Sequence, residues 1–322
     1  MLNGISLLPE CPCSVRTGTF SRETQAFVNY LRGLRNRLQY ASKHREFDWM
    51  DELQISFIER VLILTKDLKA ARRRWTGAGF AVGEISEDSL HHVRFARFAV
   101  GAITLELYEL LDATLAAPLG AALLNRLGRV EGVTGWIWGC VRPAHRAQQP
   151  SKDCPMVELP EGLAGTFTAA EEKRGSFEER RVEGQRHFGP NPNGVTYLDH
   201  IVIMVPDLAA AMATQESAGL PCLRVREAGS GLKQAFFKLE QTVLEVVGPA
   251  PKRPGVWGLA FMSDDIDQAL ATARAAGLQA TAPKFAIQGG RIARIVEPLD
   301  GVEVAFMEAP KKGSTPNRQL GC

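Results

Sequence analysis

"HIVIMVPDLAAAMATQESAGL", residues 200–220, is the stretch that decides the fold of this chain. Its apolar opening is typical of a β-strand. Asp207 follows, and its carboxylate can accept hydrogen bonds from the free N–H groups at the start of a helix. An Ala-rich segment of helix length comes next, and Gly219 suits the left-handed position that ends a helix. The stretch therefore predicts a strand, a capped helix and a turn.

The same pattern occurs in three copies, around "VLILTKDLKAA", "IVIMVPDLAAA" and "LAFMSDDIDQA". In each copy a Gly follows the Asp by twelve residues, and a Glu in an apolar strand follows that Gly by 26 or 27 residues. The aspartates are Asp67, Asp207 and Asp265, the glycines are Gly79, Gly219 and Gly277, and the glutamates are Glu106, Glu245 and Glu303. A repeat of this kind indicates one structural unit used several times.

Three further strands follow the helix in each copy. In the second copy they lie near "CLRVRE", "KQAFFKLE" and "TVLEVVGP", so the unit is βαβββ. Such a unit must bury its free sheet face against a neighbour, which predicts paired modules. The second and third copies adjoin over residues 195–310. The first copy, about residues 55–112, requires a partner, and residues 132–190 are the candidate, although they lack the Asp and Gly markers.

The sequence therefore predicts four regions: an extension over 1–54, domains over 55–190 and 195–310, and a tail over 311–322. From Cys11 to Arg45 the extension has seven basic residues and one acid. Four apolar residues share one helical face there: Phe27, Leu31, Leu34 and Leu38. Residues 1–46 resemble an organelle transit peptide, and the alternative is an extra helix packed on the first domain.

The composition of the chain limits the partners and the cellular compartments that we expect for the protein. The chain has 38 basic and 36 acidic residues and a net charge of +2, which gives no case for nucleic acid or a membrane surface as partner. Its longest apolar region, residues 98–124, contains three acids and is no membrane span. The six cysteines form no CxxC pair, and we interpret them as reduced thiols. We therefore expect an intracellular protein, cytoplasmic or organellar, with a homodimer left open.

The segments "YLDHIVIMVPDLAAAM", "VLEVVGP" and "GLAFMSDDIDQALATARAAGL" resemble the vicinal oxygen chelate superfamily, the group of glyoxalases, bleomycin-resistance proteins and extradiol dioxygenases. "HHVRFARFAVGAITLELYELL" resembles the first module of glyoxalase-like domains. The resemblance implies an α+β fold in which tandem βαβββ modules pair into cup-shaped sheets, with two such domains in this chain.

The resemblance also implies a divalent metal inside the cup, bound by the first and last strands of each module. Carried onto this chain, the metal ligands are His200, Glu245 and Glu303, and the ion is Zn, Ni, Mn or Fe. Glu245 or Glu303 would also act as the catalytic general base. Gly258 stands at the fourth ligand position, and Ala305 shares a strand face with Glu303, so either residue could align with the family's carboxylate. In the first copy we expect Arg60 and Glu106 to form a structural ion pair.

Side chains alternate between the two faces of a strand, so residues two apart share a face; this strand parity suggests which residues bind substrate. Arg224 and Arg226 share one strand face, and an Arg inside the cup would bind an anion bidentately; the alternative is that these side chains face solvent. The substrate-binding set consists of Arg224, Arg226, Gln234, Phe236, Trp257, Gln288 and Arg291.

Three functions follow from the resemblance. The first is a metal-dependent lyase or isomerase acting on a small, oxygen-rich substrate. The alternative is a non-enzymatic protein that binds or sequesters a small molecule, as bleomycin-resistance members do. The third is an extradiol-type dioxygenase, which would need a second His where Gly258 stands.

Overall fold

The fold is known from a computed structural model. It describes residues 54–88, 93–111, 131–141, 157–159, 167–172, 175–250, 254–286 and 289–310. The chain divides into two compact units, Met1–Glu52 and Leu53–Cys322, and every described residue lies in the second. The predicted transit segment and the C-terminal tail therefore lie outside the described residues. No helix in the described ranges has the length and apolar character of a membrane span.

Within the described ranges, the first sheet contains seven strands. Its elements are β1 (Gln54–Leu64), α2 (Leu68–Gly77), β2 (Ser86–Asp88), β3 (Val93–Val100), β4 (Ile103–Leu110), β5 (Gly132–Val141), β6 (Val157–Leu159) and β7 (Phe167–Glu172). The strand order is β2-β3-β4-β1-β5-β7-β6. β1 and β4 pair in parallel, as β5 and β7 do, and β1 joins β5 in antiparallel fashion. The strands from β5 to β7 thus repeat the pairing of the first module.

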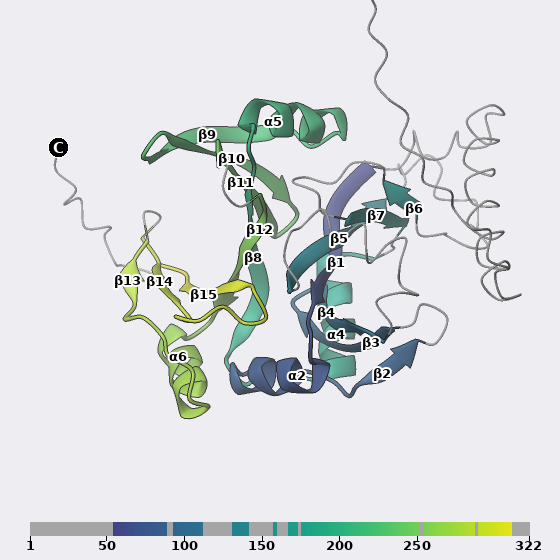
Figure 1. The fold of residues 1–322 in the computed structure, drawn as a ribbon, viewed down its shortest axis with the longest axis vertical. Coiled ribbons are helices and arrows are strands. Elements are labelled where there is room, and N and C mark those ends of the chain that lie inside the picture. The colour runs from purple at the N-terminus through teal and green to yellow at the C-terminus, as the bar shows by residue number, and fades with distance from the viewer. Residues whose placement is uncertain are drawn as a thin grey trace, which may run out of the picture. The chain divides into compact units, whose positions relative to one another are not determined.

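The second sheet contains eight strands built from two complete βαβββ modules. The first module has β8 (Val195–Met204), α5 (Leu208–Ser217), β9 (Cys222–Gly229), β10 (Leu232–Leu239) and β11 (Thr242–Gly248). The second has β12 (Gly255–Ser263), α6 (Ile266–Ala275), β13 (Lys284–Phe285), β14 (Arg291–Arg294) and β15 (Glu303–Glu308). The order is β13-β14-β15-β12-β8-β11-β10-β9. Figure 1 shows the sheet curling, so that its two ends lie on the same side of β8 and β12. The predicted fold class is confirmed.

The repeated Asp and Gly residues have the roles that their spacing predicts. Asp67, Asp207 and Asp265 cap their helices, and each carboxylate accepts a hydrogen bond from a backbone N–H of the first turn. Gly79, Gly219 and Gly277 follow the three helix ends with φ of +86°, +81° and +84°. These values fall in the left-handed region that side chains with a Cβ avoid.

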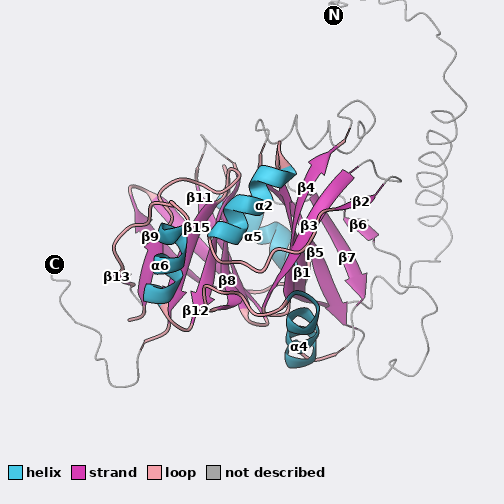
Figure 2. Ribbon diagram, turned by 90° about the horizontal axis from the view of Figure 1, so that it is seen from below, coloured by secondary structure: helices cyan, strands magenta, loops and turns pink. Residues whose placement is uncertain are grey.

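One helix was not predicted. α4 (Phe177–Phe188) precedes β8 and begins with a capping box, in which Ser176 and Glu179 bond to each other's backbone N–H. Its Arg180 guanidinium lies 3.6 Å from the centre of the Phe57 ring and donates to Glu240 at 2.5 Å. Figure 2 shows α4 beside one end of the strands of the first sheet. The helix therefore ties β1 to the hairpin between β10 and β11.

The two sheets share one hydrophobic core. Trp75 and Phe80 from the first module contact Phe261 of β12, and Phe80 also stacks on Phe306 of β15. Phe98 of β3 contacts both Trp75 and Phe80. All five rings are fully or almost fully buried. Burial of aromatic side chains is a large source of stability, so the sheets fold as one unit.

Buried Asp300 adds a polar link between the two sheets. It accepts hydrogen bonds from Trp75 Nε1 at 2.9 Å and Thr65 Oγ1 at 3.0 Å, and it pairs with Arg74. Asp300 has a φ of +47° and Gly301 a φ of +75°, in the tight turn between Leu299 and Val302. An Asp-Gly pair suits such a turn.

The three helix-ending glycines give a matched stability test. Gly219→Ala and Gly277→Ala should each lower the free energy of unfolding by about 1 kcal/mol, because only the positive φ is strained. Gly79→Ala should lower the free energy of unfolding by more than either of these substitutions. Its Cβ would lie 2.6 Å from Asn193 Cβ and 2.8 Å from Thr272 Cγ2, whereas the other two positions are open. Urea unfolding of the three variants measures the difference, and equal losses would contradict this packing.

Asp300→Ala should destabilise the protein by roughly 2–4 kcal/mol, because it leaves buried Trp75 and Thr65 donors without an acceptor. Asp300→Asn should cost less, since it keeps one acceptor oxygen and tolerates a positive φ. Thermal and urea unfolding of both variants test the link. Equal stability of Asp300→Ala and the unaltered protein would show that the link contributes nothing.

Candidate functional site

The second sheet has one buried face and one face that is partly open. Ile201 and Ile203 of β8 and Leu244 and Val246 of β11 are fully buried in the core. The alternate residues, which include His200, Val202 and Glu245, are only partly buried. Because side chains alternate along a strand, these residues share the opposite face, on the inside of the curl. We call this the cup face.

The strand register brings four of the predicted substrate-binding residues onto the cup face beside Glu245. Phe236 of β10 is the cross-strand partner of Glu245. On the next strand, Arg224 pairs with Phe236 and Arg226 with Gln234. The two arginines of β9 share a face, as strand parity predicts, and the register adds that this is the face of Glu245.

A chain of hydrogen bonds connects these side chains. Arg226 Nε donates to Gln234 Oε1 at 2.5 Å, and Gln234 Nε2 donates to Glu245 Oε1 at 2.5 Å. The Arg224 and Arg226 guanidiniums lie 4.6 and 5.0 Å from the centre of the Phe236 ring. Cation–π contacts of this length hold a guanidinium in place without using its N–H groups. Each Arg has five N–H donors, and Arg226 uses its Nε–H for Gln234, so the pair keeps donors for an anion.

Glu245 has an altered acidity. Burial raises the pKa of its carboxyl above the usual value. The positive charges of His200, Arg226 and Arg224 lower it, as does the hydrogen bond from Gln234, but only in part. The protonated, neutral form of Glu245 is therefore more accessible near neutral pH than in a free Glu. A buried acid with a shifted pKa is typical of sites that bind ligands or transfer protons.

Asp199 is a site residue that sequence reasoning missed. The pairing of β8 with β12 shifts between His200 and Leu198, so Asp199 is an extra, bulged residue. Its carboxylate contacts His200 Nδ1. Burial raises the pKa of the Tyr197 hydroxyl, and the Asp199 charge adds to the rise. A bulge turns two successive side chains to the same side, an event that alternation along a strand does not anticipate.

The register also decides between Glu303 and Ala305. Leu62, Val202 and Ala260 each stand five residues before the capping Asp of their module. Their partners in the last strand are Glu106, Glu245 and Ala305, respectively. Ala305 therefore occupies the position of the carboxylate, and Glu303 lies two residue pairs earlier, opposite Gly258.

Glu303 and Gly258 constrain each other. A Cβ on Gly258 would lie 2.7 Å from the Glu303 carbonyl oxygen, so no larger side chain fits there without a shift of the strand. Glu303 Oε2 lies 3.6 Å from Arg294 Nη1. This is longer than a hydrogen bond, and the oxygen has no hydrogen-bond partner in the described structure. The fourth ligand position is thus closed by backbone packing.

These positions bear on the divalent metal that the family resemblance implies. The described residues contain no group of three or more His, Cys, Asp and Glu side chains that could hold a metal ion. His200 and Glu245 lie at ligand positions, whereas Ala305 and Gly258 offer no ligand atom. A catalytic metal site normally has three protein ligands. The donor set on the cup face does not fit such a site.

The other predicted substrate-binding residues lie in different places. Trp257 is the extra residue of a bulge in β12 and is 41% exposed. Arg291 lies on the helix-covered side of the sheet, where it pairs with Glu308 at 2.6 Å and Asp267 of α6 at 2.9 Å. It is therefore not brought together with Glu245. Gln288 lies outside the described residues.

The equivalent face of the first sheet carries an ion-pair cluster. Arg60 Nη1 lies 3.4 Å from Glu106 Oε2, and Arg97 Nε donates to the same oxygen at 2.6 Å. The expected ion pair between Arg60 and Glu106 is confirmed, with Arg97 as an additional partner. Two arginines around one carboxylate leave it no role as a metal ligand.

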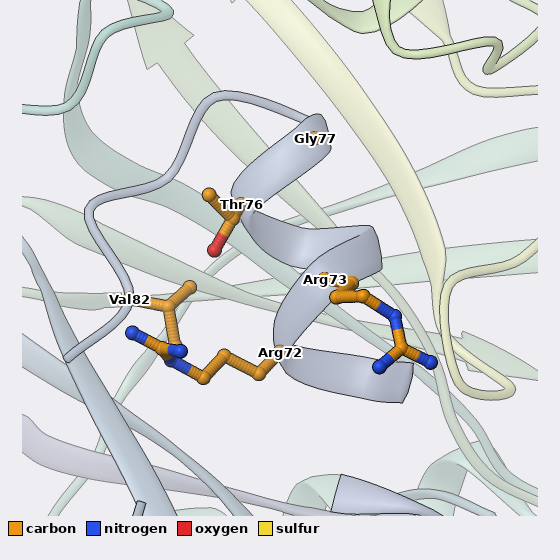
Figure 3. A pocket seen from close by; sticks show the side chains of 5 residues that line it. All are labelled: Arg72, Arg73, Thr76, Gly77 and Val82. Carbon is orange, nitrogen blue, oxygen red and sulfur yellow. The ribbon is translucent and has the colours of Figure 1, made fainter. Parts of the chain in front are cut away.

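A hollow also opens on the surface of α2, away from the cup face. It is lined by Arg72, Arg73, Thr76, Gly77 and Val82 (Figure 3). Arg72 is held there by the Gly83 carbonyl oxygen at 2.8 Å and by Glu84. None of the predicted site residues lines it.

Comparison with known proteins agrees with this architecture. The model of the Glyoxalase/Bleomycin resistance protein/Dioxygenase superfamily matches residues 199–293. No curated protein matches the chain. A mutant 4-hydroxymandelate synthase from Streptomyces coelicolor shares the fold with a TM-score of 0.56 and 15% identity, over 83% of this chain and 94% of that one.

A shorter match is methylmalonyl-CoA epimerase from Mycobacterium tuberculosis. It is 22% identical, covers 37% of this chain and 91% of the epimerase, and has a TM-score of 0.33. The family match lies on the module that carries the cup-face residues, and the fold likeness extends over most of the chain. Residues 199–293 thus match the superfamily of glyoxalases, bleomycin-resistance proteins and dioxygenases, and the likeness over most of the chain is one of fold.

Proposed function

We propose that the cup face of the second sheet binds a small, oxygen-rich anion without a resident metal ion. The observation that carries this proposal is the series of hydrogen bonds from Arg226 through Gln234 to Glu245. In addition, the guanidinium groups of Arg224 and Arg226 both lie over the Phe236 ring. Guanidinium groups bind carboxylates and phosphates through paired N–H donors. The two guanidinium groups of Arg224 and Arg226, side by side on the cup face, form an anion-binding surface.

The surroundings of the arginines suit such a ligand. Contact with Phe236 and Gln234 restricts the guanidinium positions before binding, so less conformational entropy is lost on binding. The raised pKa of Glu245 favours its neutral form relative to an exposed Glu, which reduces charge repulsion with a bound anion. His200 adds a further donor near the centre of the face.

The metal-dependent functions receive less support. The lyase or isomerase chemistry expected from the family needs a third ligand, and Ala305 stands where that carboxylate would be. The dioxygenase chemistry needs a second His at residue 258, where the Glu303 backbone leaves room only for Gly. The non-enzymatic binding alternative requires a cup and none of these ligands.

Proton transfer on the bound anion is a second candidate function. Burial raises the pKa of the Glu245 carboxyl, which favours its use as a group that gains and loses a proton. His200 is oriented by Asp199 through Nδ1, which is how a general base is commonly held. Two proton-transfer groups on one face would suit an isomerase that needs no metal.

Malonate is a suitable probe of anion binding. Arg226→Gln should weaken malonate binding at least tenfold, because it removes a charged donor from the cup face. Arg73→Gln, which removes an equal charge from an exposed position on α2, should leave binding unchanged. Isothermal titration calorimetry measures the malonate affinity of the unaltered protein and of both variants. Equal affinities for the unaltered protein and Arg226→Gln would refute the proposed site.

Sulfate, which keeps its charge across the pH range used, tests the role of Glu245. Since the pKa of Glu245 is raised, its carboxylate becomes neutral as the pH falls through that value, and sulfate affinity should rise. In Glu245→Gln the side chain is always neutral, so part of this pH dependence should disappear. Titrations of both proteins at a series of pH values give the comparison. Identical pH profiles would exclude Glu245 from the binding site.

Metal titration addresses the absence of a third ligand directly. Zn²⁺ and Ni²⁺ added to purified, chelator-treated protein should bind weakly and without a fixed stoichiometry. His200→Ala should leave this weak binding unaltered. Calorimetry with metal analysis of the dialysed protein provides the readout. Binding of one ion per chain that disappears in His200→Ala would overturn the metal-free proposal.

A further inference from the structure

The second sheet ends in a long edge strand. In the described part of the chain, β9 has eight residues, whereas the edge strands β2 and β6 of the first sheet have three each and β13 has two. Figure 1 shows β9 as the outermost strand of the second sheet, beside α5. Proteins commonly keep edge strands short, because the unpaired backbone N–H and C=O groups can pair with another strand. Of the described sheet edges, β9 is therefore the one best suited to accept an added strand.

The side chains of β9 are open to solvent on both faces. Leu223 is 62% and Val225 46% exposed, although α5 contacts this strand. Arg224, between them, is also exposed, and Arg226 is partly buried. Apolar side chains with this exposure, next to unpaired backbone groups, favour pairing with another strand.

The pairing of β9 with β10 limits the length of an added strand. The register is regular from Arg224 to Glu227, and it shifts on either side because Leu223 and Ala228 are extra residues. Such bulges bend a strand and increase its twist. A partner strand would therefore follow β9 over a short segment around Val225 rather than along its whole length.

The free charge at this edge is positive and lies on the cup face. Arg224 and Arg226 contact neutral groups, namely the Phe236 ring and, for Arg226, the side-chain amide of Gln234. Glu227 lies on the other face of β9, where its carboxylate is 3.4 Å from the Lys233 ammonium. Opposite charges on neighbouring strands stabilise the pairing and like charges destabilise it. An added strand is thus favoured when it places acids beside the two arginines.

Charge also argues against a second copy of β9 as the added strand. Directly opposite residues of an antiparallel pair project from the same face. A two-fold pairing centred on Val225 would place Arg224 opposite Arg226 of the second copy, and a pairing centred on either arginine would place that residue opposite itself. Each of these registers brings guanidinium groups together.

We propose that the outer edge of β9 binds an extended peptide in which acidic and apolar residues alternate, added to the sheet as one more strand. The acidic side chains pair with Arg224 and Arg226, and the apolar ones cover Val225 and Leu223. Main-chain hydrogen bonds supply affinity in this mode of recognition, and alternate side chains supply specificity. The inference goes beyond the proposed function but shares its two arginines, so malonate and the peptide compete for them.

The probe is the fluorescein-labelled peptide GVEVEVG, with GEEVVVG of the same composition and an N-methylated form of GVEVEVG as controls. Fluorescence anisotropy at low salt should show the alternating peptide binding at least tenfold more tightly than either control, because one control loses the alternation and the other loses the backbone N–H donors. Malonate should displace it, and Arg226→Gln should weaken both ligands.

Variants of the apolar residues separate the peptide from the small anion. Leu223→Thr combined with Val225→Thr keeps the strand propensity of β9 and should weaken peptide binding at least fivefold, while malonate affinity stays the same. Phe285→Thr is the matched control, since it removes a 74% exposed apolar side chain from β13 at the opposite end of the sheet. It should alter neither affinity. Thermal unfolding confirms that each variant is folded.

The outcomes distinguish this inference from the proposed function. If malonate binds in an Arg226-dependent way but the three peptides bind equally or not at all, the edge proposal is overturned and the anion site stands. If the alternating peptide alone binds and malonate does not, the edge proposal stands and the small-anion function is refuted. A dimer in sedimentation velocity that the double threonine variant abolishes would make a second copy the occupant and overturn the proposal.

Discussion

The parallel pairing of the first and last strands in each module is the constraint on which the site depends. This pairing sets which side chains meet inside the curl. It places Glu245 beside Val202 in one module and Ala305 beside Ala260 in the next. A register error of one residue would turn every side chain to the other face. The chemistry of the cup therefore follows from hydrogen bonds between backbones that are distant in sequence.

Much of the architecture could be predicted because it is local and repeated. The capping aspartates, the helices and the glycines that end them follow one another within about twenty residues, and each is determined by its own backbone requirement. Parity along each strand groups Arg224 with Arg226 and Gln234 with Phe236, whereas only the register between β9 and β10 puts all four on one face. The capping box at Ser176 is a sequence signal for the start of a helix, but α4 is absent from the elements that we expected from the sequence.

The rest of the site depends on irregularities in the strand pairing that cannot be predicted from the sequence. The bulges at Asp199 and Trp257 break the alternation of side chains, so Asp199 contacts His200 on the cup face. Equal spacing from Gly219 and Gly277 suggests that Glu245 and Glu303 are equivalent, but the register of β12 with β15 puts Ala305, two residues later, at the position of Glu245. Arg291 belongs to the helix-covered side because Glu308 and Asp267 hold it there.

In our account, the curled second sheet binds an anion with arginines where a metal would otherwise hold the ligand. Crystals grown with selenate would test that account most directly, because the anomalous signal of selenium locates the anion. We predict that the strongest peak lies within hydrogen-bond distance of the guanidinium of Arg224 or Arg226. A strongest peak elsewhere on the protein, away from both arginines, would contradict the account.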